Sequence, residues 1–217
     1  MKANIIKKLM ASAFAVSLVM APVMGVSASS STTVDVETVV NEAISESTSG
    51  EITTVAEVPS TSSVAGVKTT VAGAYLAQKV NGTIVSTPVS TIAQGYGLAS
   101  NEKPYAKFSD MDPKKSYLAK ASLDIAAASQ GATLGPMLNI ELGKMTAGKY
   151  SLLPSDGAPI RLSVGIPGNF AQDGKTYAVV CVRAGGAFTI LQDVDTNPNT
   201  VTFDTKGGAG AYAIIRY

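Results

Sequence analysis

Four oxygen-bearing side chains alternate along one stretch near the C-terminus, and a fifth lies further on: Asp193, Asp195, Asn197, Asn199 and Asp204. Oxygen ligands at alternating positions are what a hard cation such as Ca²⁺ requires, and this spacing matches five ligand positions of the helix–loop–helix calcium loop. The sixth position of that loop needs a glycine, but here it is Pro198, whose φ angle is fixed at a negative value. The pattern therefore predicts a polar hairpin loop built from turn-forming residues. A calcium site of non-helical geometry on Asp193, Asp195, Asn197 and Asn199 is the alternative.

Residues that commonly perform nucleophilic and acid–base catalysis are scarce. The chain has no histidine, which is the usual general base for nucleophilic side chains and a common ligand of zinc and copper. Its single cysteine, Cys181, lies in an apolar run, where a buried and unreactive thiol is expected, and no intramolecular disulfide can form. Acids such as Asp110, Asp124 and Glu141 could converge in space, but nothing in their spacing favours a catalytic pair. We therefore expect no enzymatic activity and no cofactor, with a secreted carboxylate-dependent hydrolase as the alternative.

A second candidate site, for binding, is the stretch between residues 94 and 105, which is rich in glycine, tyrosine and asparagine. Tyr96, Asn101 and Tyr105 could stack on, and hydrogen-bond to, a sugar or a protein surface. They are the candidate binding residues. The competing interpretation is an ordinary connection whose tyrosines cover the core.

From residue 67 onward, short apolar runs separated by turn residues indicate a mainly β fold. Strict alternation of apolar and polar residues over 138–142 and 160–166 predicts strands with one solvent-exposed face. The run 176–182 is apolar on both faces, which predicts a central strand. Asn81-Gly82 suits a two-residue hairpin turn. Gly185-Gly186 turns the chain into further strands, expected at 187–191, 199–205 and 211–217. The last 60 residues or so are typical of an antiparallel meander.

One helix is expected from about residue 112 to 130. Asp112 is a suitable N-cap, Pro113 fits the first helical position, and Gly131 can close the end in the left-handed region. An apolar stripe recurs at helical spacing along it: Leu118, Ala121, Ile125 and Ala128. We expect the helix to pack across the end or edge of an antiparallel β-sandwich.

The first 28 residues have the layout of a secretory signal peptide. Three lysines near the start precede an uncharged apolar run from residue 9 to about 19, and small residues offer a cleavage point after Ala28. A retained membrane anchor is the alternative, although alanine, serine, proline and glycine dilute the run. We expect cleavage, and no transmembrane segment in the mature chain.

Residues 29–65 are rich in serine and threonine, and they contain six acidic side chains, no basic one and no aromatic one. Such a stretch buries too little apolar surface to offset its ordering entropy, so we expect a mostly disordered linker. One exception follows Asp35, where apolar residues recur at helical spacing: Val36, Val39, Val40, Ala43 and Ile44. A helix this short would form mainly when bound to something else.

Residues 66–217 contain 14 basic and 10 acidic side chains, spread along the segment. This mild excess lacks the clustering that a phosphate backbone would require, so nucleic acid is not an expected partner. The C-terminus has no L-P-x-T-G sequence with an apolar tail. We therefore expect no sortase anchor, and any association with the cell envelope would be non-covalent.

Three stretches carry a resemblance: Val71-Ala-Gly-Ala-Tyr75, Gly135-Pro-Met-Leu-Asn-Ile-Glu-Leu142, and the tail from Asp193 to the final strand at 212–217. Through them, residues 67–217 resemble a β-sandwich module that recurs in secreted and surface proteins of anaerobic Gram-positive gut bacteria. The resemblance implies an exported binding or surface role, and it carries over no catalytic residue.

These patterns predict three parts: a signal peptide (1–28), an acidic linker (29–65) and a β-sandwich domain (66–217). We expect an extracellular or envelope-associated module that binds a protein or a glycan. A Ca²⁺-stabilised carbohydrate-binding module is a sharper form of the same hypothesis.

Overall fold

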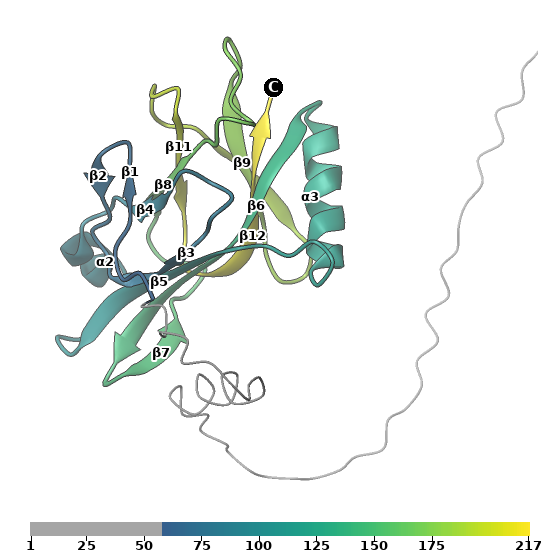
Figure 1. The fold of residues 1–217 in the computed structure, drawn as a ribbon. Helices are drawn as coiled ribbons and strands as arrows, with labels where there is room; N and C mark the ends of the chain where they lie inside the picture. The colour runs from purple at the N-terminus through teal and green to yellow at the C-terminus, as the bar shows by residue number, and fades with distance from the viewer. Residues whose placement is uncertain (1–57) are drawn as a thin grey trace, which may run out of the picture. The chain divides into compact units, whose positions relative to one another are not determined.

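The structure is a computed structural model, and it describes residues 58–217. The predicted signal peptide, the predicted helix at 36–44 and nearly all of the predicted linker lie outside the described residues. The described part is mainly β and has two sheets that pack against each other, which confirms the predicted β-sandwich (Figure 1). No helix in residues 58–217 has the length and apolar character needed to cross a membrane.

The larger sheet has seven strands. Six follow one another in space: β10 (Phe188–Gln192), β9 (Tyr177–Val182), β12 (Gly208–Arg216), β6 (Thr133–Thr146), β5 (Glu102–Asp110) and β3 (Gly73–Leu76). The seventh, β7 (Lys149–Leu152), pairs with the end of β6. All neighbours are antiparallel except β3 and β5, because the chain leaves the sheet after β3 and returns from the other side of the sandwich.

The smaller sheet contains β11 (Thr200–Thr205), β8 (Ile160–Gly165) and β4 (Thr83–Val85). A two-stranded ribbon, β1 (Ser63–Val64) with β2 (Val67–Lys68), precedes it in the chain. Alternate residues of both sheets meet in one core, which includes Leu138, Ile140, Leu162, Val164, Phe203, Tyr212 and Ile214. The alternation read at 138–142 and within 160–166 thus places the larger side chains in that core.

The predicted strands are confirmed, but the predicted meander is wrong. β8 and β11 pair with each other in the smaller sheet, whereas β9, β10 and β12 lie in the larger one. The Asn81-Gly82 turn is likewise not a hairpin. It leads from the larger sheet into β4, and the Asn81 amide donates to the carbonyl of Gly165 at 3.0 Å.

Helix α3 (Tyr117–Ser129) covers the second face of the larger sheet over β9 and β12 (Figure 1). It begins later than predicted, because Asp112 forms a separate turn in which its side chain accepts the Lys114 amide at 2.9 Å. The buried residues of α3 are Leu123, Ala126 and Ala127. The predicted stripe of Leu118, Ala121, Ile125 and Ala128 is exposed, so the predicted packing face was wrong.

Two further features depart from the sequence prediction. A short helix, α2 (Val89–Gly95), follows Pro88 and was not predicted; it buries only Ile92. Ordered contacts also begin before residue 66, since the carbonyls of Pro59 and Ser60 accept the amides of Tyr75 and Gly73 along the free edge of β3. The predicted boundary at 66 falls inside the β1–β2 turn and is therefore too late.

Candidate functional site: the open face of the larger sheet

The half of the larger sheet that α3 leaves uncovered presents a row of polar side chains. Tyr105, Lys107 and Ser109 alternate along β5 with Ala106 and Phe108, which are buried in the sandwich core. They therefore lie on the opposite face, the one that α3 partly covers.

Strand register extends this face across three strands. Tyr105 is paired with Gly143, Lys107 with Glu141, and Ser109 with Asn139, all between β5 and β6. On the far side of β6, Glu141 and Asn139 are paired with Ala209 and Ala211 of β12. We call this surface the open face. It carries aromatic and charged groups near β7, and small side chains near α3.

A cluster of tyrosines and one ion pair occupies the β7 end of the open face. The rings of Tyr105 and Tyr150 meet edge to face, with centroids 5.8 Å apart and planes at 70°. Lys107 Nζ lies 4.0 Å from the centre of the Tyr150 ring and 3.6 Å from Glu141 Oε2. Tyr150 can lie over the sheet because position 143 is glycine; a Cβ there would come within 2.5 Å of the ring.

The Tyr150 hydroxyl is buried and has no hydrogen-bond partner among the described residues. Burial, and secondarily the nearby Glu141 carboxylate, raise the pKa of Tyr150 well above its ordinary value. The phenol is therefore neutral at physiological pH and is not a candidate general base.

A groove of about 820 Å³ runs along the α3 side of the open face. Leu118, Ala121, Ser122 and Ile125 of α3 form one wall. The floor comes from β5, β6, β9 and β12, and residues 183–186 of the β9–β10 turn also line the groove. Its lining is thus mostly small or apolar, and its polar side chains are Ser109, Ser122, Asn139, Glu141 and Arg183.

Two wall residues leave large apolar surfaces in water: Leu118 is 69% exposed and Ile125 is 64% exposed. Fully burying a side chain of this type is worth roughly 1.5–3 kcal/mol. Leu118 and Ile125 line the same groove. A partner that covered both side chains at once would therefore gain the free energy of burying each of them within one contact surface.

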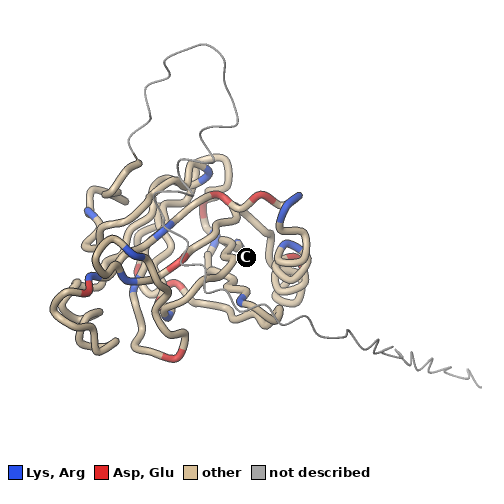
Figure 2. The backbone as a smooth tube through the Cα atoms, turned by 90° about the horizontal axis from the view of Figure 1, so that it is seen from below, with Lys and Arg blue, Asp and Glu red and all other residues tan. Residues whose placement is uncertain are grey.

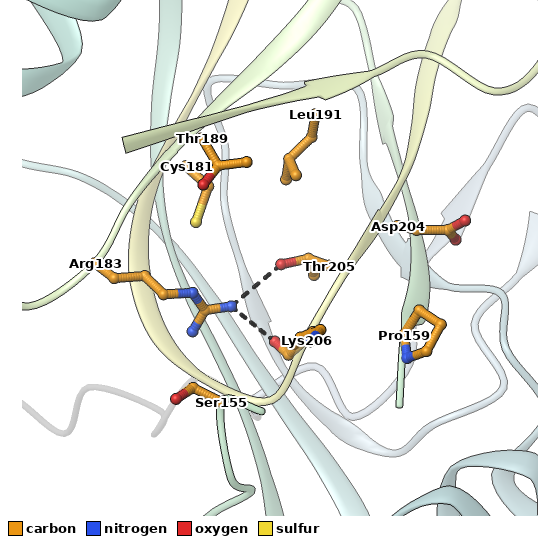
Figure 3. Close-up of a pocket in the computed structure, with 9 residues that line it drawn as sticks. All are labelled: Ser155, Pro159, Cys181, Arg183, Thr189, Leu191, Asp204, Thr205 and Lys206. Atoms are coloured by element: carbon orange, nitrogen blue, oxygen red, sulfur yellow. Dashed lines mark hydrogen bonds between the residues drawn. The ribbon is translucent and has the colours of Figure 1, made fainter. Parts of the chain in front are cut away.

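A second hollow, of about 360 Å³, has Arg183 in its lining in common with the groove (Figure 3). The Arg183 guanidinium donates to the carbonyls of Gly207 at 2.8 Å and Lys206 at 3.0 Å, so it holds the β11–β12 turn. Asp204, on its wall, accepts two bonds of 2.8 Å from Arg161. Cys181 is buried, as the sequence led us to expect, and burial raises the pKa of its thiol, which disfavours the nucleophilic thiolate.

The three candidate binding residues do not converge on one surface. The Tyr96 hydroxyl donates to the Ala158 carbonyl at 2.7 Å and accepts the Gly207 amide at 2.8 Å, and its ring packs against the sandwich core. Asn101 is exposed in the turn before β5. Only Tyr105 lies on the open face. Lys107, two residues along the same strand from Tyr105, and Tyr150 were not singled out from the sequence. Only the register between β5, β6 and β7 brings Tyr150 beside Tyr105.

The acidic loop uses its oxygens as turn acceptors. The side chains of Asp193, Asp195 and Asn197 each accept the amide two residues further on, at 3.2, 2.8 and 3.0 Å. Asp193 also accepts the Thr202 amide at 2.9 Å, and burial raises the pKa of its carboxyl group. This is the geometry expected of a polar turn, but the loop joins β10 of the larger sheet to β11 of the smaller one, so the predicted hairpin is wrong. No cluster of three or more metal-ligating His, Cys, Asp or Glu side chains occurs in residues 58–217.

The carboxylates considered for catalysis hold separate partners. Asp110 accepts the amides of Gln78 and Lys79, Asp124 pairs with Lys120 one turn earlier in α3, and Glu141 pairs with Lys107. Basic and acidic residues are interspersed along the described backbone (Figure 2). The geometry therefore offers a contact surface, the open face with its groove, more readily than a reactive centre.

Comparisons of the chain with known protein families, with characterised proteins and with solved structures gave no match.

Proposed function

We propose that this protein is an exported, non-enzymatic binding module that takes up an apolar segment of a protein partner in the groove beside α3. The observation that carries the proposal is the exposure of Leu118 and Ile125 on the groove wall. Large contiguous apolar surface on a soluble domain is characteristic of an interaction site. The signal-peptide layout of residues 1–28 supports secretion, with any attachment to the cell envelope being non-covalent.

The open face suits a protein better than a glycan. Sugars bind to aromatic rings through an exposed ring face, but Lys107 lies over Tyr150 at 4.0 Å and Tyr105 meets Tyr150 edge-on. Aliphatic side chains wall the groove instead, and aliphatic groups beside small residues accommodate an amphipathic helix.

Several observations support a non-enzymatic role. The chain contains no histidine, the carboxylates near the open face are paired with lysines, and the pKa of the Cys181 thiol is raised.

The proposal is tested by screening the chain from residue 29 against a displayed peptide library and a glycan array. We expect selected peptides to carry apolar residues at helical spacing, and Leu118→Asp to weaken their binding by about tenfold or more, the cost of losing one buried anchor. Tyr117→Asp is the matched control, since Tyr117 is 66% exposed on the same helix but does not line the groove. Binding to glycans only, or peptide binding that Leu118→Asp leaves unchanged, would contradict the proposal.

A further inference from the structure

We propose that the first occupant of the groove is this chain's own segment 35–46, bound as a short amphipathic helix that an external partner must displace. The inference rests on the binding role proposed for the groove and adds a regulatory step to it. The sequence pattern, the reach of the chain and the distribution of charge each support it.

The pattern of the segment fits the groove. Val36, Val39, Val40, Ala43 and Ile44 are spaced at i, i+3, i+4, i+7 and i+8, which places them on one face of a helix. Twelve helical residues are about 18 Å long, and the 13 residues of α3 along the groove wall span about 20 Å. Too short to be stable alone, such a helix needs a surface that buries its apolar face.

The chain can reach the groove. The Pro59 carbonyl accepts the Tyr75 amide on β3, so the described chain starts at the β3 edge of the larger sheet. From there, three inter-strand steps lead past β3 and β5 to β6 on the groove floor, about 14 Å in all. Residues 47–57 can span roughly 36 Å when extended. Tethering of this kind raises the local concentration of the segment to the millimolar range, about 10⁻³ M.

Charge also favours the pairing. The segment carries Asp35, Glu37, Glu42 and Glu46 and no basic residue. The described part has 14 basic and 10 acidic side chains, and Lys114 and Lys115 precede the wall residue Leu118. The first turn of α3 has no acidic residue to repel the segment. The one acid on the groove floor, Glu141, is paired with Lys107.

Hydrogen exchange measured by mass spectrometry tests the inference on the chain beginning at residue 29, without added ligand. In the wild type we expect the amides of 36–44 to exchange about tenfold more slowly than a random coil, or slower still. Ile125→Asp, at an exposed wall position, should abolish this protection. Tyr117→Asn, which adds no negative charge to the first turn of α3, should leave it intact. Unchanged exchange in β6 and β12 will verify that both variants remain folded.

Each other result overturns the inference. Exchange of 36–44 at random-coil rates in the wild type means that the segment is unbound. Protection that survives Ile125→Asp places the segment elsewhere, and protection that rises with protein concentration assigns the groove to a second copy. These readouts use no external ligand, so the groove can fail to bind the segment and still bind selected peptides. In that case the binding function stands without the internal occupant.

Discussion

Replacing Tyr96 with phenylalanine removes a single oxygen that connects two distant loops. The Tyr96 hydroxyl donates to the carbonyl of Ala158 at 2.7 Å and accepts the amide of Gly207 at 2.8 Å. The ring is enclosed as well, because position 157 is a glycine whose Cβ would overlap it. Burial raises the pKa of the Tyr96 phenol above its ordinary value, so it remains neutral and able to donate across the physiological range.

The expected cost follows from those two bonds. Losing the donated bond removes about 1 kcal/mol, and the Gly207 amide, which is buried, loses its acceptor at a cost of about 1–3 kcal/mol. A void the size of one oxygen adds little. We therefore expect Tyr96→Phe to lower the free energy of unfolding by about 2–4 kcal/mol, which corresponds to a decrease in Tm of about 4–16 °C for a domain of this size.

Urea and thermal unfolding of Tyr96→Phe should be compared with Tyr117→Phe, which alters an exposed tyrosine and should change stability by less than about 0.5 kcal/mol. Peptide binding in the groove should be unaffected by Tyr96→Phe, since Tyr96 packs against the sandwich core. Equal stability of the two variants would refute the reasoning, and lost ligand binding at unchanged stability would restore Tyr96 as a binding residue.

Three further perturbations test other parts of the structure. Leu123→Ala should lower the free energy of unfolding, measured by chemical denaturation, by about 2–5 kcal/mol because Leu123 of α3 is buried against the larger sheet. Leu118→Ala should lower it by less than about 0.5 kcal/mol, since Leu118 is exposed. Equal costs would mean that α3 packs with a different face on the sheet. Millimolar Ca²⁺ should leave Tm unchanged, because the Asp195 side chain already accepts the Asn197 amide; a rise specific to Ca²⁺ and abolished by Asp195→Ala would establish the calcium site instead. The Arg161 guanidinium lowers the pKa of Asp204. At pH values above the ordinary carboxyl pKa, this largely exposed ion pair should therefore stabilise the fold by at most about 1 kcal/mol. That contribution should be lost as pH falls through the ordinary and then the lowered pKa, and an Arg161→Gln variant whose deficit persisted at pH of about 2 would contradict the assignment.

Local patterns in the sequence predicted most individual strands. The alternation of apolar and polar residues over 138–142 predicted a strand because successive side chains of a strand point to opposite faces of the sheet. Leu138, Ile140 and Leu142 are buried as expected. Within the run at 176–182, residues 178–182 are buried on both faces because β9 lies between the sandwich core and α3. Turn chemistry is equally local, and the acidic loop forms the expected side-chain bonds to amides two residues away.

Strand pairing depended on contacts between residues distant in the chain. β8 and β11 pair across an intervening hairpin, which no local signal distinguishes from a simple meander. The open face depends on the same kind of contact. Tyr105 and Lys107 are neighbours on one strand, but Tyr150 joins them only through the register of β5, β6 and β7.

The rotation of α3 shows most clearly what only the tertiary structure decided. The helix has two apolar stripes, and hydrophobicity alone favours the one with Leu118 and Ile125. The sheet beneath presents small side chains, such as Ala178, Ala211 and Ala213. Ala126 and Ala127 of α3 match this surface, because small residues on both sides let the helix approach closely and pack without voids. The bulkier stripe is left beside the groove, where its apolar side chains remain exposed.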